Sequence, residues 1–325
     1  MKSLVNYQEI EKAYNRIFNY ATKTPLLSSD LLNKEFSSNI FIKAENLQKI
    51  GAFKFRGAMN SILKLDDDKK NVLAWSSGNH AQAIASACYL TNKNATIVMP
   101  EDSPNAKLNG TKSWGANIVT FDRYSESREE IGTNLAKEIN AEIIPPFDHP
   151  DVINGQGTVG YEIIKDCKND NLDPDLVLCC CGGGGLIAGV STAIKAEYPN
   201  VPIYAVEPED YNDTYLSLRD NKITEVDVSK KSICDSLLAS KPGELTFSIN
   251  KENLSGSLLV SDLEALKAMK YAFQYFKIIL EPGGAVALAS ALFNKIDIKN
   301  KTVVIIASGG NVDPDIFEKS LKISI

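Results

Sequence analysis

The sequence is poor in the residues that several common kinds of functional site require. Its 325 residues include only two histidines, His80 and His149, which argues against a Ser-His-Asp hydrolase triad. The six cysteines form no Cys-x-x-Cys pair, which argues against a zinc site, and they are too sparse for a disulfide scaffold. Cys179 to Cys181 are consecutive, but neighbours on a strand point to alternate faces and cannot converge on one ion. We expect these three thiols to be buried packing groups.

Positive charge and long apolar runs are also scarce. Lysine and arginine number 35 against 41 aspartates and glutamates, and the net charge of −6 argues against a nucleic-acid or anionic-membrane partner. No run of about 18 apolar residues occurs, so we expect no membrane-spanning helix. The first ten residues lack an apolar signal core. These absences predict a cytoplasmic protein. They leave a small anionic ligand open, because one local pocket can override the overall charge.

The sequence does contain a near-continuous alternation of short β-rich apolar runs with longer amphipathic segments. The strand-like runs are Asn39–Lys43, Val72–Ser76, Ala95–Met99, Asn117–Phe121, Asp175–Cys181, Ile203–Val206 and Thr302–Ala307. The helix-like stretches are Val5–Tyr20, His80–Leu90, Ser125–Ile139, Gly155–Lys168, Leu186–Tyr198 and Leu263–Phe276. This alternation predicts an α/β fold with mostly parallel sheets covered by helices. We expect two lobes, a large domain of residues 1–68 and 146–325 and a small α/β domain of residues 69–145.

A run of four glycines, Gly182 to Gly185, follows one predicted strand and precedes a predicted helix. Successive glycines let the backbone approach an anion closely, and the start of a helix supplies free N–H groups and the positive end of the helix dipole. We therefore expect a phosphate here, although a tight turn without a ligand is the alternative. Gly183, Gly185 and Ala188 also satisfy a G-x-G-x-x-A dinucleotide pattern, with Glu207 ending the next strand. That match is weak, because glycine runs satisfy such patterns easily.

Polar residues follow other strands. The segment Ser76-Ser77-Gly78-Asn79-His80 lies between a strand and a helix and can form a carboxylate cradle, or Ser77 or Asn79 can simply cap the helix. Ser308 opens Ser-Gly-Gly-Asn after the last strand, where a hydroxyl can face a heteroaromatic nitrogen or a plain turn can form. Glu281 begins Glu-Pro-Gly-Gly before a helix, with capping as its alternative role.

Lys54 lies between two aromatic residues, Phe53 and Phe55. Desolvation there would disfavour the ammonium form and free an amine nucleophile for a carbonyl, although most lysines are solvated surface groups. The combination is more telling than any single segment. A phosphate cradle, an amine between aromatics, a carboxylate loop and a hydroxyl after a strand are the parts that a pyridoxal-phosphate site needs.

With these motifs the sequence resembles the fold type II pyridoxal-phosphate enzymes, specifically the serine racemase and serine/threonine dehydratase group. The resemblance runs from Thr24-Pro25-Leu26 to Ser308-Gly309-Gly310-Asn311, which is nearly the whole chain. Its motifs, in order, are Phe-Lys-Phe-Arg-Gly-Ala, Ser-Ser-Gly-Asn-His, Gly155-Gln156-Gly157-Thr158, the tetraglycine and Ser-Gly-Gly-Asn. It implies a two-lobed fold type II enzyme, and a homodimer is the family expectation.

The resemblance also implies a role for each matching residue. Lys54 holds the cofactor as an imine and then acts as a base on one face of the substrate, while Ser77 provides the hydroxyl on the opposite face. The glycines from Gly182 to Gly185 bind the phosphate, Asn79 hydrogen-bonds the ring hydroxyl and Ser308 meets the pyridine nitrogen. The cofactor-binding residues implied in this way are Phe53, Lys54, Asn79, Gly182, Gly183, Gly184, Gly185, Glu281 and Ser308.

A divalent-cation site is implied at Glu207, Asp213 and the backbone carbonyl of Tyr211. Two carboxylates at this spacing suit Mg²⁺, with Ca²⁺ or Mn²⁺ in its place, whereas capping of a helix is the ordinary alternative. Two departures from the family also matter. Racemases that respond to ATP carry Thr and Ser where this sequence has Ile50 and Ala52, so we do not expect nucleotide activation. The sequence stops soon after Ser308, so we do not expect the regulatory domain that gives feedback inhibition by isoleucine.

Dehydration of L-serine or L-threonine to a 2-oxo acid and ammonia is the reaction we favour. A hydroxyl partner at the pyridine nitrogen does not enforce ring protonation, which favours prompt loss of a β-hydroxyl. Serine racemisation and 3-hydroxyaspartate dehydration remain open, because they share the same proton abstraction. A nicotinamide oxidoreductase would leave Lys54 without a role, and a non-catalytic cofactor-binding protein would have no need of both Lys54 and Ser77.

Overall fold

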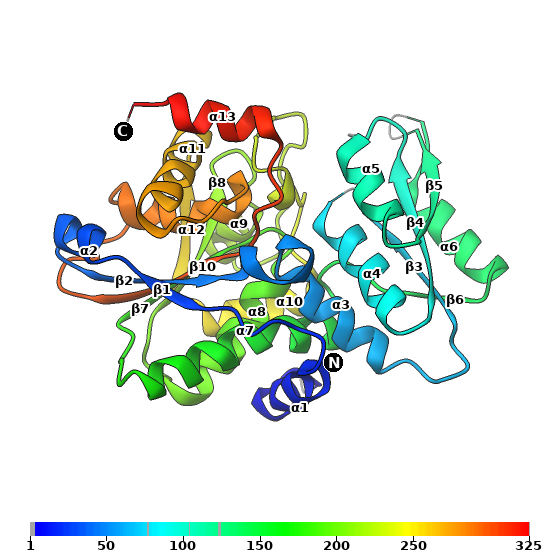
Figure 1. Cartoon of the computed structure of the whole chain (residues 1–325), viewed down its shortest axis with the longest axis horizontal. Helices are drawn as coiled ribbons and strands as arrows, with labels where there is room; N and C mark the ends of the chain where they lie inside the picture. The colour runs from blue at the N-terminus through cyan, green and yellow to red at the C-terminus, as the bar shows by residue number, and fades with distance from the viewer. Residues whose placement is uncertain (1–3, 77, 104, 123–124, 325) are drawn as a thin grey trace.

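The larger of two sheets forms the left part of the molecule in Figure 1. The computed structural model describes residues 4–76, 78–103, 105–122 and 125–324. The larger sheet has six strands in the order β1-β2-β10-β7-β8-β9, and only the pairing of β1 with β2 is antiparallel. Its strands are β1 Leu26–Ser28, β2 Asn39–Ala44, β7 Leu176–Cys180, β8 Ile203–Pro208, β9 Gly256–Val260 and β10 Thr302–Ala307.

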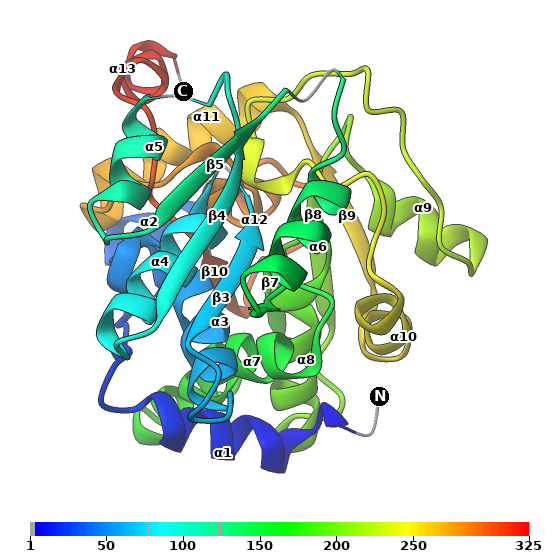
Figure 2. The ribbon, with the colours of Figure 1, turned by 90° about the vertical axis from the view of Figure 1, so that its right-hand side faces the viewer.

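The smaller sheet is parallel throughout and has the order β5-β4-β3-β6. Its strands are β3 Asn71–Trp75, β4 Asn94–Pro100, β5 Asn117–Phe121 and β6 Ala141–Ile143. Figure 2, which is turned toward this sheet, shows α4 and α5 to one side of its strands and α6 to the other. Because parallel neighbours need a crossover connection, a helix follows β3, β4 and β5 in turn.

Helices also cover both faces of the larger sheet. Figure 1 shows α11 and α12 above its strands and α7, α8 and α10 below them. The helices are α1 Tyr7–Ile17, α2 Asp30–Phe36, α3 Lys54–Leu63, α4 Asn79–Leu90, α5 Asn105–Lys112, α6 Arg128–Glu138, α7 Pro150–Asn169, α8 Gly185–Glu197, α9 Asp213–Asp220, α10 Glu244–Asn253, α11 Asp262–Tyr271, α12 Pro282–Leu292 and α13 Pro314–Lys322. Shorter helical turns are η2 Glu45–Leu47, η3 Lys49–Gly51, η4 Asp235–Leu237 and the π-helical η5 Ala272–Phe276.

The two central strands of the larger sheet explain why the fold forms from this sequence. Every residue of β7 is buried, and β10 is buried from Val303 to Ala307. Strands covered by helices on both faces tolerate continuous apolar runs, and both runs consist mainly of valine, leucine, isoleucine and cysteine. The expected burial of Cys179 to Cys181 is confirmed, since their exposed fractions are 0%, 3% and 1%.

Helix α3 connects the two parts of the molecule. Its residues Phe55, Met59 and Ile62 belong to the same buried cluster as Val72 of β3 and Ile84 of α4. The first residue of this helix is Lys54. The proposed division into residues 1–68 with 146–325 and residues 69–145 stays a prediction, although the smaller sheet does fall between residues 71 and 143.

All seven predicted strands are present to within two residues of their predicted ends, whereas one predicted helix starts too late. Helix α7 begins at Pro150 after the capping residue His149, not at Gly155. Glycines in its first half obscure the helical pattern, but packing requires them. A Cβ atom on Gly155 would lie 2.6 Å from the Cα of Gly57 in α3. The short strands β1, β6 and β9 were not predicted.

Among the helices in the described part of the chain, none combines the length and the apolar character needed to cross a bilayer.

Candidate active site

The carboxyl ends of β3, β7 and β10 border a cavity of about 480 Å³. Ligands of open α/β sheets bind outside the carboxyl ends of the strands, so its position is that of a binding site. The cavity is bordered by most of the residues singled out in the sequence, namely Phe53, Lys54, Asn79, Gly182, Gly183, Gly184, Gly185, Glu281 and Ser308. Ser77 lies outside the described residues.

Lys54 has the surroundings of a reactive amine. Its Nζ donates to the carbonyl oxygen of Pro146 at 2.7 Å and lies 5.3 Å from the ring centroid of Phe53. Burial lowers the pKa of the Lys54 amine to about 8, although the nearby Cys180 and Glu281 oppose that shift. Of the two flanking aromatic residues, only Phe53 lies against the Lys54 amine, because Phe55 is buried in the core with Met59. An amine with this pKa carries a substantial neutral fraction near neutral pH, which nucleophilic attack on a carbonyl requires.

The loop before Lys54 is held against the loop after β10. The N–H of Phe53 donates to the carbonyl of Ser308 at 3.0 Å, and Ala52 forms an isolated antiparallel bridge with Gly309. These contacts fix the start of α3 relative to the end of β10. Lys54 and Ser308 therefore border the same cavity, although 254 positions separate them in the sequence.

The tetraglycine is shaped as an anion cradle between β7 and α8. Gly184 precedes α8 with φ of 90°, a left-handed conformation that favours glycine. A Cβ atom on Gly183 would lie 2.4 Å from the ring of Phe147. No hydrogen bond found among the described residues uses the N–H groups of Gly182 to Gly185, and N–H groups at the start of a helix have no partner within it. These unused donors at the positive end of α8 suit a phosphate.

Asn79 does not cap its helix, since Gly78 occupies the capping position. The Nδ2 of Asn79 donates to Oε1 of Glu281 at 2.8 Å, and its Oδ1 accepts from Asn311 at 2.7 Å. Glu281 is 3% exposed, and its backbone N–H donates to the carbonyl of Gly309 at 3.1 Å. These contacts bring the start of α4, the start of α12 and the loop after β10 together at one wall of the cavity.

His80 is a structural residue rather than a base. Its Nε2 lies 2.9 Å from the carbonyl oxygen of Ile144, which can only accept, so this nitrogen carries the proton. Burial, followed by the nearby Lys54, lowers the pKa of His80 to about 3, and the ring stays neutral at physiological pH.

A second group of acidic residues lies at the end of β8. Glu207 and Asp213 are fully buried, and neither oxygen of Asp213 has a hydrogen-bond partner in the described part of the chain. Glu207 accepts from the N–H groups of Thr214 and Tyr215 at 2.8 Å each. Burial, and then the charge of Glu207, raises the pKa of Asp213 to about 9. Buried oxygens without donors are what a hard cation requires, so the residues present fit the implied metal.

The third implied ligand is the backbone of Tyr211. Its phenol hydroxyl is occupied, because it donates to the carbonyl oxygen of Lys230 at 2.9 Å. The ligand implied by the sequence is the backbone carbonyl, so this use of the hydroxyl does not conflict with it. The described residues contain no group of three or more His, Cys, Asp or Glu side chains that could hold a metal, so any site here needs carbonyl or water oxygens beside two carboxylates.

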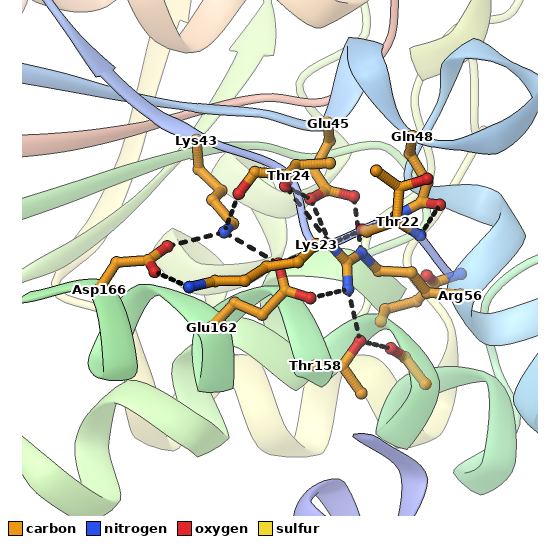
Figure 3. A network of polar contacts seen from close by, with 12 residues as sticks. Thr22, Lys23, Thr24, Lys43, Glu45, Gln48, Arg56, Thr158, Glu162 and Asp166 are labelled. Atoms are coloured by element: carbon orange, nitrogen blue, oxygen red, sulfur yellow. Dashed lines mark hydrogen bonds and ion pairs between the residues drawn. The ribbon is translucent and has the colours of Figure 1, made fainter. Parts of the chain in front are cut away.

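Arg56, two residues after Lys54, is the centre of a buried ionic network (Figure 3). Its guanidinium donates to both oxygens of Glu45 at 2.7 Å and to those of Glu162 at 2.8 and 2.9 Å. Lys43 contacts Glu162 at 2.9 Å and Asp166 at 3.0 Å, and Lys23 also contacts Asp166. Three cations thus face three carboxylates, and Arg56 and Glu45 are fully buried. The network joins the start of α3 to β2 and α7.

Among the further residues that border the cavity, Arg128, Cys180 and Asn311 are polar groups to which the sequence analysis assigned no role. Cys180 and Cys181 both border the cavity, Cys180 lies close to Lys54, and the Sγ of Cys181 contacts the hydroxyl of Thr214 at 3.3 Å. The place of Cys180 two residues before the tetraglycine was the available signal. Arg128 comes from α6, and no local pattern marks it.

One family model and three known proteins match this chain over most of its length. The family model described as "Pyridoxal-phosphate dependent enzyme" matches residues 17–309. An L-threo-3-hydroxyaspartate ammonia-lyase of Saccharomyces cerevisiae is 45% identical over 309 residues, which cover 94% of this chain and 93% of that protein. A serine racemase of Schizosaccharomyces pombe is 42% identical over 313 residues, 95% of each chain. A solved structure of a threonine deaminase from T.th. has a TM-score of 0.90 and 39% identity, and the match covers 95% of this chain and 99% of that one.

Proposed function

This chain belongs to the pyridoxal-phosphate-dependent enzymes, in the group of ammonia-lyases and racemases, and we propose that it dehydrates and deaminates a small hydroxy-amino acid to a 2-oxo acid and ammonia. The family resemblance, the α/β fold class and the pyridoxal-phosphate requirement inferred from the sequence are confirmed. The nicotinamide alternative has no support, because the family model that matches residues 17–309 is that of a pyridoxal-phosphate-dependent enzyme.

The observation that supports this function most strongly is the desolvated amine of Lys54 in a cavity with a glycine cradle. When bound, the cofactor supplies an electron sink that stabilises negative charge at the α-carbon of an amino acid. In the proposal, Lys54 first holds the cofactor aldehyde and later removes the α-proton of the substrate with its Nζ. The N–H groups of Gly182 to Gly185 bind the phosphate, and the Ser308 hydroxyl faces the pyridine nitrogen.

The remaining cavity residues orient the substrate. We place the substrate carboxylate at the loop from residue 76 to Asn79, where the N-terminus of α4 offers N–H groups. Asn79 donates to the ring hydroxyl, while Phe53 and Glu281 border the ring. Ser77 is proposed as the hydroxyl on the face opposite Lys54. If it delivers a proton before the β-hydroxyl leaves, the product is the opposite enantiomer.

A 3-hydroxyaspartate substrate is a second candidate, because Arg128 borders the cavity. Its Nε contacts the neighbouring Glu129 at 2.8 Å, and both side chains are more than half exposed, at 56% and 55%. An exposed pair of this kind is weak and readily exchanged. The guanidinium is therefore available to the second carboxylate of a dicarboxylic substrate, which it can bind in a bidentate manner.

Product analysis tests both candidates. The holoenzyme is incubated with L-serine, L-threonine or L-threo-3-hydroxyaspartate, and 2-oxo acid, ammonia and D-enantiomer are measured. We expect 2-oxo acid and ammonia in equal amounts. D-Serine formed rapidly with little pyruvate would contradict the proposed reaction but not the cofactor.

The Arg128→Met variant separates the substrates. We expect kcat/KM for 3-hydroxyaspartate to fall about tenfold more than kcat/KM for L-serine, because only the former has a second carboxylate. Arg219→Met is the matched control, since Arg219 is an exposed arginine paired with its neighbour Asp220. Equal losses on both substrates would remove the case for a dicarboxylate site.

We also propose that Glu207, Asp213 and the carbonyl of Tyr211 bind Mg²⁺, or Ca²⁺ or Mn²⁺ in its place. The two unpartnered oxygens of Asp213 support this site. A homodimer and a cytoplasmic location complete the proposal. Light scattering on the purified protein tests the first, with twice the mass of one chain as the expected result.

A further inference from the structure

Asn311 makes two short hydrogen bonds at the wall of the cavity, although the proposed chemistry gives it no role. Its Nδ2 donates to the carbonyl oxygen of Ile50 and to Oδ1 of Asn79, each at 2.7 Å. The first contact comes from the loop before Lys54, where Ile50 has φ of 61°. The second comes from the start of α4, so Asn311 joins the loop before α3 to the smaller sheet's first helix.

The orientation of these amides is determined by a group that cannot donate. A backbone carbonyl only accepts, so the Asn311 atom facing Ile50 must be the nitrogen. That nitrogen also faces Asn79, and the Asn79 atom it meets must then be the oxygen. The Asn79 nitrogen is consequently turned toward Glu281, to which it donates at 2.8 Å.

The Asn79 amide therefore has a fixed orientation at the cavity. The Asn79 amide has two N–H groups, and one of them is used by Glu281. The second remains for the cavity that Asn79 borders. Reversing the Asn79 amide would instead place its oxygen against the Glu281 carboxylate and toward the ligand, and two acceptors in contact repel each other.

We propose that Asn311 is a positioning residue that makes Asn79 a hydrogen-bond donor to the ring hydroxyl of the cofactor. This inference rests on the proposed function of the cavity. Asn311 does not touch the cofactor in this scheme; it acts by fixing which end of the Asn79 amide faces it.

The Asn311→Asp variant tests the idea, because it keeps the size of the side chain and removes both donors. Residue 311 then competes with Glu281 for the Asn79 nitrogen, and every Asn79 amide that turns toward residue 311 has its oxygen facing the cavity. We expect the dissociation constant of pyridoxal 5′-phosphate for the apoenzyme to rise about tenfold, the effect of losing one hydrogen bond. Asn311→Ala removes the constraint without reversing it, so we expect a smaller rise of about threefold.

A cofactor analogue distinguishes positioning from general disruption of the loop. 3-Deoxypyridoxal 5′-phosphate lacks the ring hydroxyl, so its dissociation constant should change less than about twofold in either variant. Equal weakening of the cofactor and the analogue would mean that Asn311 only holds the loop before Lys54, and would overturn the inference.

Two further results on cofactor binding would each overturn the inference. Wild-type affinity of Asn311→Asp for the cofactor would overturn the inference while leaving the proposed function intact. Failure of the wild-type apoenzyme to bind pyridoxal 5′-phosphate at all would overturn both. Asn79→Ala provides the reference, because adding Asn311→Asp to it should weaken cofactor binding no further.

Discussion

At the scale of single residues, the chemistry depends on how far Lys54 is removed from water. A lysine amine in solution titrates near pH 10.4 and is almost fully protonated at neutral pH. Burial lowers the pKa of the Lys54 amine to about 8, which raises the neutral fraction by roughly two orders of magnitude. The surrounding groups then hold this amine in place, since Pro146 accepts its hydrogen bond.

This pKa predicts how fast the apoenzyme captures its cofactor. Below pH 8 most of the Lys54 amine is protonated and only the neutral fraction can attack an aldehyde, so the rate of capture should rise as pH increases and level off above the pKa of about 8. Stopped-flow absorbance measures this rate of capture at pH values between about 6.5 and 9.5. A profile that still rises steeply at the upper limit would indicate an unperturbed lysine and contradict this account.

The buried Asp213 predicts how the stability of the protein responds to metal removal. With no cation, burial and the charge of Glu207 raise the pKa of Asp213 to about 9, so folding at neutral pH must protonate a carboxyl that is ionised in the unfolded chain. Asp213→Asn removes this cost and should therefore raise the melting temperature in the presence of a chelator by about 2 °C or more. Adding Mg²⁺ should stabilise the wild type, by about 2.7 kcal/mol at a hundredfold excess over Kd, and leave the variant unchanged.

Differential scanning fluorimetry reads both effects of Asp213→Asn. Asp210→Asn is the control, because Asp210 is close in sequence but exposed and paired with Lys230. The metal proposal fails if Mg²⁺ stabilises Asp213→Asn as much as it stabilises the wild type.

At the scale of structural elements, the position of Lys54 depends on how α3 is anchored. Arg56 lies in the first turn of α3, and its bonds to Glu45 and Glu162 connect that turn to the segment after β2 and to α7. Buried ion pairs contribute little compared with apolar packing, but removal of one partner leaves an unpaired charge in the interior. The network should therefore be sensitive to a single change.

Arg56→Met makes that change with a side chain of similar length. The carboxylates of Glu45 and Glu162 then lose their main counter-ion, and the free energy of unfolding should fall by about 3–5 kcal/mol. Urea unfolding followed by circular dichroism measures the loss. Arg219→Met, an exposed position, should stay within about 0.5 kcal/mol of wild type. A loss below about 1 kcal/mol for Arg56→Met would show that the network does not anchor α3.

The sequence predicts those elements whose signal is local. The apolar runs of β7 and β10 and the glycines after β7 can be read directly, because each depends on neighbours in the chain. The Arg56 network cannot, since it joins residues from 23 to 166 and only the fold brings them together. The same holds for Asn311, whose partners lie 261 and 232 positions away. Arg56 and Asn311 each belong to a motif quoted from the sequence, but the contacts that these residues make are tertiary.

At the scale of the whole molecule, two sheets and the helix between them create one site. Residues from the starts of α3, α4, α8 and α12 and from the end of β10 border the same cavity. The overall negative charge does not oppose an anionic cofactor, because free N–H groups at the start of α8 provide a local positive field. Arrangement of the strand ends, rather than net charge, therefore determines what the protein binds.

The covalent attachment of the cofactor to Lys54 is the claim on which the rest depends. It is tested by reducing the purified holoenzyme with borohydride and mapping the labelled peptide by mass spectrometry. We predict one pyridoxyl group per chain, on Lys54, and none in Lys54→Ala, while Lys49→Ala is labelled like the wild type. Labelling of a different lysine, or no labelling of protein incubated with pyridoxal 5′-phosphate, would contradict the account.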